Sequence, residues 1–191
     1  SDDPKLWRSG TEPHPANLAA SYGRHVADAL DAELICQASS GGSNDRVIRT
    51  TKDWIAANPT KLKDTFMILQ WTTWEREEWL HDGVYYQVGS SGLDHVPQEL
   101  QERYRNYVIG TDWELKTQQA HDQIWQLHQE LNDRKIPHVF FNTFNSFEFV
   151  PNIGGTYLGW GDCFVEPYLE SYTYCSWLKN QGYQPVSATS M

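Results

Sequence analysis

The sequence lacks an excess of positive charge and lacks any long hydrophobic run. Its 191 residues hold 15 lysines and arginines against 25 aspartates and glutamates, a net charge of -10. A protein that binds nucleic acid neutralises phosphates with a basic surface, so we expect no nucleic-acid partner. No stretch of about 18 apolar residues occurs, and the first residues lack the apolar core of a signal peptide. We therefore expect a soluble protein with no membrane partner.

Cysteine is scarce, and the sequence patterns of metal and nucleotide sites are absent. Cys36, Cys163 and Cys175 follow no spacing typical of a disulfide framework or a zinc site, so we expect reduced, mostly buried thiols. The glycine motifs of nucleotide-binding loops and the H-E-x-x-H motif do not occur. His121 and His128 fall seven residues apart on a predicted helix, where we expect both to be exposed. The sequence predicts no metal and no other cofactor.

Aromatic side chains are abundant. They make up 14% of the residues and include nine tryptophans. Tryptophan and tyrosine need hydrogen-bond partners when they are buried. We therefore expect some of these side chains to line a surface or a cleft.

The length fits one domain, and the apolar pattern predicts an α/β fold. Continuous apolar runs, typical of central strands covered on both faces, occur at 33–38 (ELICQA), 64–71 (DTFMILQW) and 136–142 (IPHVFFN). Amphipathic segments that predict helices occur at 17–30, 44–57, 97–110 and 112–135. Ser43 or Asn44 can cap the second of these helices. We expect a flavodoxin-like fold of three α/β/α layers with a mostly parallel sheet.

The remaining segments are less regular. Residues 71–97 and 143–167 form two long aromatic excursions, and loops of this length are usually functional or disordered. A helix is predicted at 168–181 and a final short strand at 182–189. In a parallel sheet, ligands bind beyond the carboxyl ends of the strands. We expect one cleft there to gather Ser43, Asn44, Trp71, Thr72, Arg76, Asn142 and Asn145.

The segment from Gly41 to Asn44 permits two interpretations. Backbone N–H groups and the Asn44 amide at a helix N-terminus can stabilise an anion or a developing oxyanion. A tight turn followed by a helix cap accounts for the same residues. Ser43 would act as a nucleophile only with a base within hydrogen-bond reach, and capping is the more frequent role at such a position.

The tryptophan-rich segment 71–79 also permits two interpretations. If it is helical, Arg76 lies beside Glu75 and Glu78, and nearby indole faces can stack on a sugar ring. Arg76 would then orient a ligand, because a carboxylate paired with arginine has a lowered pKa and makes a poor acid. The alternative is a tryptophan-rich cap over the sheet edge with a surface ion pair.

The order of these segments resembles the SGNH (GDSL-like) hydrolase superfamily. The resemblance rests on the strand, the SGGSNDR segment with its helix, the WTTWERE loop, the long helices and the IPHVFFN strand. The resemblance is closer to a group of SGNH-like proteins from marine and cyanobacterial phages, in which segments like SGGSNDR and WTTWERE recur. The resemblance covers about residues 16 to 186.

The resemblance implies a flavodoxin-like sheet and ester hydrolysis by a serine with a histidine base. It implies that Gly42 and Asn44 donate to the oxyanion. It also implies an acyl or sugar pocket shaped by Trp71, Thr72, Arg76 and Asn142.

Two departures from the family pattern concern the catalytic residues. No G-D-S segment follows a first strand, and no D-x-x-H segment occurs. Gly161-Asp162-Cys163 resembles G-D-S but lies too late in the chain. We expect the chain to be the middle of a longer serine esterase or deacylase, with its nucleophile elsewhere or at Ser43. The alternative is a non-catalytic phage-encoded protein that binds glycans in its aromatic cleft, in the host cytoplasm or the virion.

Overall fold

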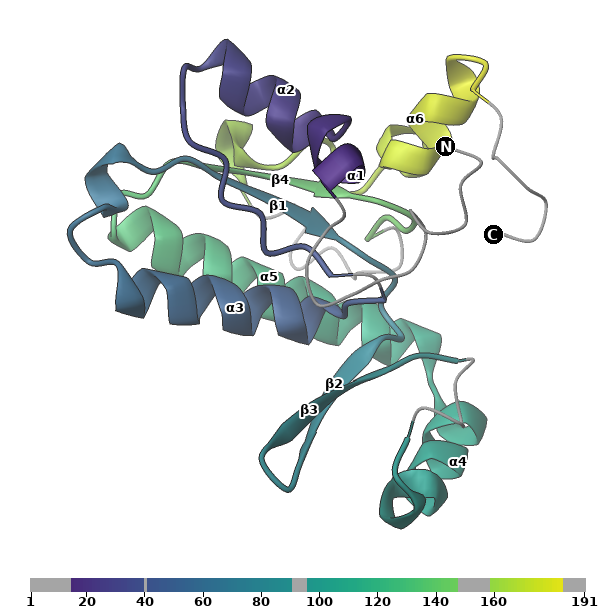
Figure 1. Cartoon of the computed structure of the whole chain (residues 1–191). Coiled ribbons are helices and arrows are strands. Elements are labelled where there is room, and N and C mark those ends of the chain that lie inside the picture. The colour runs from purple at the N-terminus through teal and green to yellow at the C-terminus, as the bar shows by residue number, and fades with distance from the viewer. Residues whose placement is uncertain (1–14, 40, 91–95, 148–158, 184–191) are drawn as a thin grey trace. The chain divides into compact units, whose positions relative to one another are not determined.

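The computed structural model describes residues 15–39, 41–90, 96–147 and 159–183, which fall into two units, Ser1–Gly42 and Ser43–Met191 (Figure 1). The first unit contains helices α1 (Pro15–Ala19) and α2 (Tyr22–Ala29). The predicted helix at 17–30 is therefore interrupted. The interruption arises because the Ser21 hydroxyl accepts a hydrogen bond from the backbone N–H of Arg24 and so caps a new helix.

The predicted strand at 33–38 is wrong. Residues 32–39 adopt no regular structure, and Ile35 is 47% exposed. A strand needs a hydrogen-bonded neighbour, and the described residues of the first unit hold no other strand. Cys36 is exposed in this segment and Cys175 is exposed elsewhere, so the expectation of mostly buried thiols is also wrong. All three cysteines are free.

The second unit contains a short parallel sheet. Strand β1 (Met67–Trp71) pairs with β4 (His138–Asn142), in register from Met67↔His138 to Trp71↔Asn142. These strands confirm the predictions at 64–71 and 136–142. Phe164 forms an isolated parallel bridge with Phe140 on β4.

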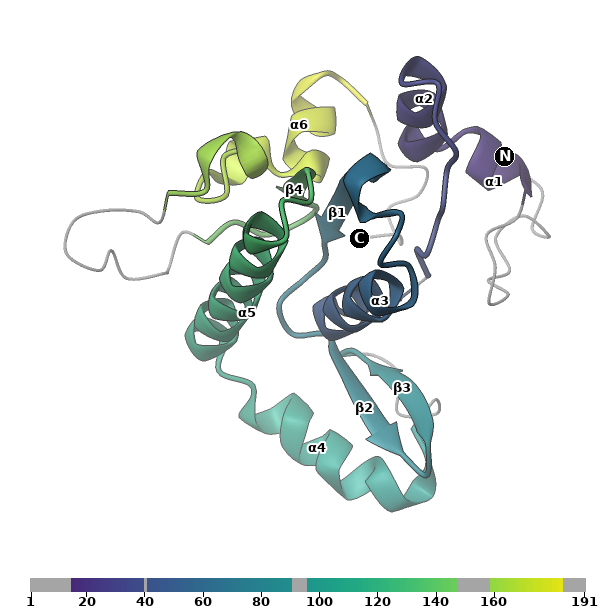
Figure 2. The ribbon, with the colours of Figure 1, turned by 90° about the vertical axis from the view of Figure 1, so that its left-hand side faces the viewer.

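Two long helices lie along one face of this sheet, as Figures 1 and 2 show. They are α3 (Asn44–Ala57), capped by Ser43, and α5 (Trp113–Asp133), capped by Asp112. The fully buried side chains on α5 include Ile124, Leu127 and Leu131, which pack with Trp71 and Phe140 of the sheet. Leu115, in the first turn of α5, lies outside this core and is 53% exposed.

A β-hairpin follows β1, where the sequence suggested an irregular excursion. Strand β2 (Glu77–His81) pairs antiparallel with β3 (Val84–Val88). The two turn residues have positive φ, 48° at Asp82 and 77° at Gly83. This conformation is typical of a type I′ turn, whose backbone twist matches that of a hairpin. The Asp-Gly pair was the sequence signal for it.

A smaller core joins the hairpin to the next helices. The short 3₁₀ segment η4 (Gln98–Leu100) leads into α4 (Gln101–Gly110), which confirms the helix predicted at 97–110. Trp79 and Val88 of the hairpin pack with Val96 and with Tyr104 of α4. A further 3₁₀ turn, η2 (Leu62–Asp64), precedes β1.

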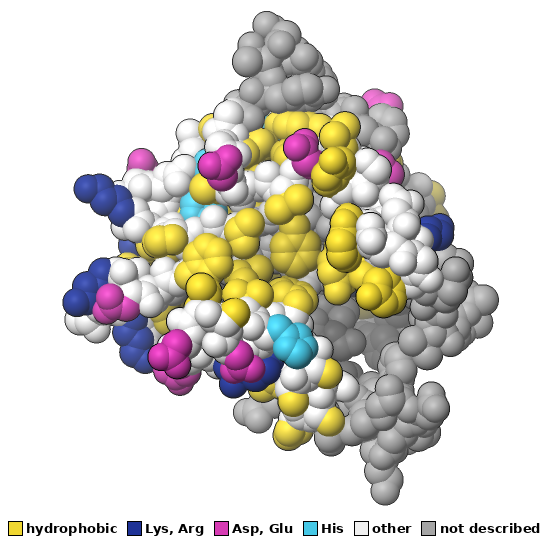
Figure 3. All heavy atoms as spheres, turned by 90° about the horizontal axis from the view of Figure 1, so that it is seen from above, with side chains coloured by type: hydrophobic (Ala, Val, Ile, Leu, Met, Phe, Trp, Pro, Cys, Tyr) yellow, Lys and Arg dark blue, Asp and Glu magenta, His cyan; other side chains and the backbone are white. Residues whose placement is uncertain are grey.

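The C-terminal described segment consists of short helices: η6 (Gly161–Cys163), η7 (Glu170–Tyr172) and α6 (Tyr174–Asn180). The helix predicted at 168–181 therefore forms only in part. On α6, the Tyr174 ring lies 5.9 Å from that of Phe141, between centroids. Figure 3 views the molecule from the side on which α6 lies, where hydrophobic side chains gather. Most of the strand predicted at 182–189, and residues 148–158 of the second excursion, lie outside the described residues.

The described residues form a mixed α/β structure with a short parallel sheet. Among the helices of the described ranges, none is both long and apolar enough to cross a membrane.

Candidate functional site

The carboxyl ends of β1 and β4 lie side by side, because Trp71 and Asn142 pair in register. The backbone N–H of Thr143 donates to the Trp71 carbonyl at 2.9 Å. The Gln70 amide donates to the Thr143 hydroxyl at 2.8 Å. Trp71 is fully buried and Asn142 is 2% exposed. Two of the predicted site residues thus meet at the expected edge of the sheet.

The N-terminus of α3 is tied to the same edge. The Asn44 Oδ1 accepts a hydrogen bond from the Thr72 backbone N–H at 2.9 Å, and its Nδ2 donates to the Thr72 carbonyl at 3.4 Å. The Arg76 guanidinium donates to the Thr72 hydroxyl at 2.9 Å. The structure therefore brings Ser43, Asn44, Thr72 and Arg76 into one group. Gly42 ends the first unit, where its N–H donates to the Ser39 carbonyl.

Ser43 acts as a helix cap in this structure. Its hydroxyl accepts a hydrogen bond from the Arg46 N–H at 3.2 Å, its own N–H donates to the Gln87 side chain, and the residue is fully buried. None of the hydrogen bonds among the described residues joins a serine hydroxyl to a histidine ring. The Asn44 amide is likewise engaged at both ends. In this conformation neither side chain is placed as a nucleophile or an oxyanion donor.

Buried polar atoms without a hydrogen-bond partner are concentrated at the carboxyl edge. They include Trp71 Nε1, Thr73 Oγ1, Asn142 Oδ1, Asn145 Oδ1 and Ser146 Oγ. Each such atom costs about 1–3 kcal/mol, so a group of them calls for an explanation. Ordered water or the polar groups of a ligand can supply partners for such atoms. The sequence singled out three of these residues; Thr73 and Ser146 were missed, although both follow predicted strands.

A pocket of about 200 Å³ opens beside this edge. It is lined by Asn44, Asp45, Trp74, Arg76, Glu77, Lys116, Gln119, Ala120 and Gln123. The Trp74 indole N–H donates to the Ser146 carbonyl at 3.4 Å, which links the pocket wall to the loop after β4. Lys116 forms an ion pair with Glu77 on the other side. The pocket therefore carries two cations, two carboxylates and several amides.

The surroundings of Asp45 shift the pKa of its carboxyl group. Burial raises its pKa, although its carboxylate accepts a hydrogen bond from the Glu78 N–H at 3.0 Å. A half-buried carboxyl group with a raised pKa beside a pocket is a candidate for binding or proton transfer. The sequence analysis missed Asp45 and the α5 residues of the pocket. The signal was the spacing of Lys116, Gln119 and Gln123, which puts them on one face of a helix.

The expected pairing of Arg76 with Glu75 and Glu78 does not occur. The segment forms a strand from Glu77 onward, and the partner of Glu78 is Arg49 on α3. The Arg49 Nε and Nη2 donate to the two carboxylate oxygens of Glu78 at 2.6 and 2.8 Å. This pair fixes the hairpin on α3, while Arg76 turns toward Thr72.

The histidines on α5 are buried, which corrects the expectation that they are exposed. His121 and His128 are each 3% exposed. The His121 ring contacts Phe147 and Trp160 edge-on, and its Nε2 lies 3.1 Å from the Tyr168 hydroxyl. Burial lowers the pKa of both imidazoles. The helix pattern did contain this information, because both residues share the face of Ile124 and Leu131.

The site as a whole is suited to binding a small polar molecule. At the carboxyl edge of a parallel sheet, it offers hydrogen-bond donors, hydrogen-bond acceptors, and both basic and acidic side chains. Comparison of the chain with protein-family models, with curated proteins and with solved structures finds no match.

Proposed function

We propose that this protein binds a small hydroxyl-rich ligand, a carbohydrate or a carbohydrate ester, at the carboxyl edge of β1 and β4. The observation that carries the proposal is the group of buried, unpartnered polar atoms of Trp71, Asn142, Asn145 and Ser146. Sugar hydroxyls both donate and accept, so a ligand of this kind is suited to an indole N–H and to amide oxygens alike.

The charges of the adjoining pocket favour a neutral ligand. Arg76 and Lys116 are balanced by Asp45 and Glu77. A strongly anionic ligand would meet the two carboxylates, and a cationic one would meet the two basic groups. Gln119 and Gln123 add amide groups suited to hydroxyl partners.

The proposed scaffold is SGNH-like. The cover of α3 and α5 on one face of the parallel sheet accounts for two of the three layers of a flavodoxin-like arrangement. The resemblance of the SGGSNDR and WTTWERE segments to phage SGNH-like proteins supports the same proposal, and with it a glycan-binding or virion-associated role.

Ligand-observed NMR tests the binding proposal. Saturation-transfer spectra would be recorded with glucose, N-acetylglucosamine and the O-acetyl esters of both. We expect transfer to at least one of these probes, and its loss in Asn145→Ala and Lys116→Ala. Lys63→Ala is the matched control, because Lys63 is exposed and, within the described part of the chain, forms its ion pair with its neighbour Asp64. No transfer to any probe, or equal loss in the control, would overturn the proposal.

A serine esterase acting on such an ester is the second candidate. It is favoured by the position of Ser43 and Asn44, at a helix N-terminus beside the residue that follows β1. Hydrolysis would require Asn44 to release Thr72, so that Gly42 and Asn44 could donate to the oxyanion. The nucleophile would be Ser43, released from its cap, or a serine outside the described residues.

A fluorophosphonate probe followed by peptide mass spectrometry separates the two candidates. An adduct on Ser43 or on another single serine would support the esterase. If the protein is not modified by the probe but binds a sugar in the NMR experiment, the binding function is supported and the esterase is not.

A further inference from the structure

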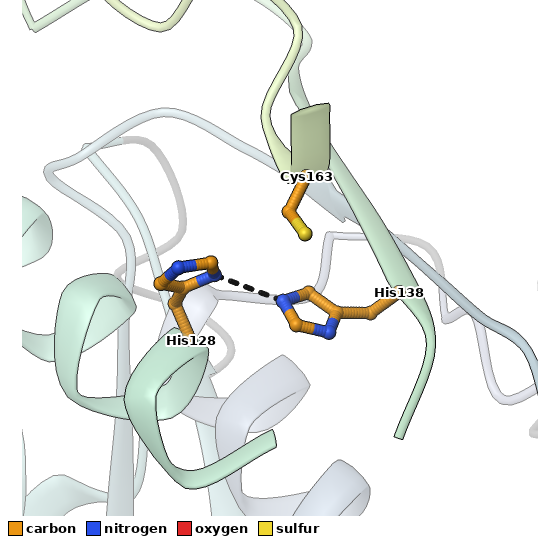
Figure 4. A group of neighbouring side chains, drawn as sticks. All are labelled: His128, His138 and Cys163. Atoms are coloured by element: carbon orange, nitrogen blue, oxygen red, sulfur yellow. Dashed lines mark hydrogen bonds between the residues drawn. The ribbon is translucent and has the colours of Figure 1, made fainter. Parts of the chain in front are cut away.

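Two buried histidines and a cysteine from three different elements face one another. His128 lies on α5, His138 begins β4 and Cys163 ends η6. One ring nitrogen of each histidine and the cysteine sulfur all lie within 4.8 Å of one another. Figure 4 shows the Cys163 side chain directed toward the two rings.

The hydrogen bonds around the rings define their protonation. The His138 Nδ1 lies 2.8 Å from the Ile136 carbonyl, which only accepts, so this nitrogen carries the proton. The neutral His138 ring therefore accepts at Nε2, and His128 donates to it from Nδ1 at 2.9 Å. The His128 Nε2 then accepts from the Asn132 amide at 2.9 Å. Both imidazoles are neutral in this arrangement, as metal ligands must be.

The Ile136 carbonyl and the Asn132 side chain contact the outer nitrogens of the two rings, where the groups that orient histidine ligands lie in metal sites. Histidine ligands usually donate their other ring N–H to a carbonyl or carboxylate. The Ile136 carbonyl already holds the His138 ring in this way, leaving Nε2 for a metal. On His128, a shift of the proton from Nδ1 to Nε2 and a rotation of the Asn132 amide would present Oδ1 as the acceptor.

To hold a tetrahedral ion, the two ring nitrogens must separate slightly and the Cys163 sulfur, which lies within 4.8 Å of both, must come to about 3.6 Å from each. Two nitrogen ligands of such an ion lie about 3.3 Å apart, and the two ring nitrogens are 2.9 Å apart. Two imidazoles with one thiolate suit Zn²⁺. The rings of Trp125, Trp160 and Phe140 surround His128 and form an apolar shell that strengthens metal–ligand interactions.

We propose that His128, His138 and Cys163 form a binding site for Zn²⁺, with the fourth coordination position open to water or to an added ligand. Binding releases one proton, from the Cys163 thiol, because the His128 proton moves to Nε2 and stays on the ring. Cys163 is partly exposed, whereas both histidines are buried, so the ion enters from the side of the cysteine. The site is independent of the proposed carbohydrate site.

Cobalt(II) is the probe for this site. The reduced, metal-free protein would be titrated with Co²⁺ while its absorption spectrum is recorded. We expect one equivalent to bind, with a sulfur-to-cobalt charge-transfer band and the visible bands of tetrahedral cobalt, all displaced by Zn²⁺. Cys163→Ser should abolish the charge-transfer band. Cys36→Ser and Cys175→Ser are matched controls and should retain it.

A substitution at Asn132, which contacts the His128 ring, should have a smaller effect than loss of a ligand. Asn132→Ala should weaken Co²⁺ binding by about tenfold without removing the charge-transfer band. Circular dichroism of each variant would verify its fold. A spectrum without the charge-transfer band, or one in which the band survives in Cys163→Ser, would overturn the proposal.

Alkylation tests the site in the unaltered protein. Iodoacetamide would be added with and without Zn²⁺, and the modified peptides quantified by mass spectrometry. We expect Zn²⁺ to slow modification of Cys163 and to leave Cys36 and Cys175 unaffected, because both are exposed and neither belongs to a group of possible metal ligands among the described residues. Equal rates at Cys163 with and without the ion would identify a buried histidine pair beside a free thiol, and no metal site.

Discussion

Asn44 and Thr72 are joined by two hydrogen bonds, from the Thr72 N–H to Asn44 Oδ1 and from Asn44 Nδ2 to the Thr72 carbonyl. The Asn44 side chain thus satisfies the backbone of the residue just beyond β1. It couples the start of α3 to the carboxyl edge of the sheet.

Replacement of Asn44 by leucine should destabilise the protein by about 1–3 kcal/mol, because both polar groups of Thr72 lose their partner in a part-buried position. Urea denaturation would measure the change. Asn106→Ala is the control, since Asn106 is exposed on α4 and should change stability by less than about 0.5 kcal/mol. Similar effects of the two variants would contradict a structural role for the Asn44 pair.

The pair of Arg49 and Glu78 should dominate the acid sensitivity of the hairpin. Burial alone would raise the pKa of Glu78, but hydrogen bonds from Arg49 and Gln87 outweigh it and lower the pKa. A carboxylate with a lowered folded-state pKa stabilises the protein above its unfolded pKa, about 4.5, and that contribution is lost as the pH falls.

We expect Glu78→Gln to cost about 2 kcal/mol at pH 7, because Arg49 loses its bidentate partner. The variant should also lose less stability than the parent between pH 5 and pH 3. Denaturation at several pH values would show this. Glu99→Gln, on the exposed η4 turn, serves as the control. Parallel pH profiles for parent and Glu78→Gln would refute the assignment.

His121 should make stability fall in mildly acid solution. Burial lowers its pKa, so the unfolded chain binds a proton at a higher pH than the folded protein does. The contribution of the neutral ring is therefore present above about pH 6.5 and is lost as the pH falls below it. Asp122, 3.5 Å from Nδ1, and the Tyr168 hydroxyl at Nε2 are the polar groups that face the ring.

His121→Gln should flatten the stability profile between pH 7.5 and pH 5. Its stability at pH 7.5 should also fall, because the ring contacts with Phe147 and Trp160 are lost. His25→Gln, at an exposed position, serves as the control. An unchanged slope in His121→Gln would show that the buried ring does not titrate in this range.

Gly83→Ala tests the hairpin turn. A Cβ at Gly83 meets no atom within 4 Å, so any cost comes from the backbone, whose φ is 77°. We expect a loss of about 1 kcal/mol, since residues other than glycine strain at this φ. At Gly110, where the Cβ also meets nothing and φ is not in this region, alanine should cost less. Thermal unfolding of both variants would make the comparison.

Local patterns predicted the parts of the fold that local chemistry determines. The strands at 67–71 and 138–142 were evident as apolar runs, and the cap at Ser43 as a helix-start signal. Ile35 has the same apolar character but no strand beside it, so its segment stays irregular. The hairpin was missed because the aromatic residues around Asp82-Gly83 obscured the alternation of its strands.

Of the candidate sites, the sequence predicted only those residues that lie at or just after the end of a strand. Trp71, Thr72 and Asn142 follow from the topology of a parallel sheet. The meeting of Asp45 with Lys116, or of His138 with Cys163, depends on how α3, α5 and η6 pack in three dimensions. No spacing along the chain encodes those distances.

The register of β1 with β4 also determines the order in which the second unit is expected to fold. The hairpin β2–β3 closes over a two-residue turn, and α3 and α5 form from local contacts. The sheet, by contrast, pairs Met67 with His138, and the whole hairpin and two helices lie between them in the chain. Pairing over such a long loop has a large entropic cost and is slow. The carboxyl edge of the sheet, and with it the proposed ligand site, should therefore assemble last.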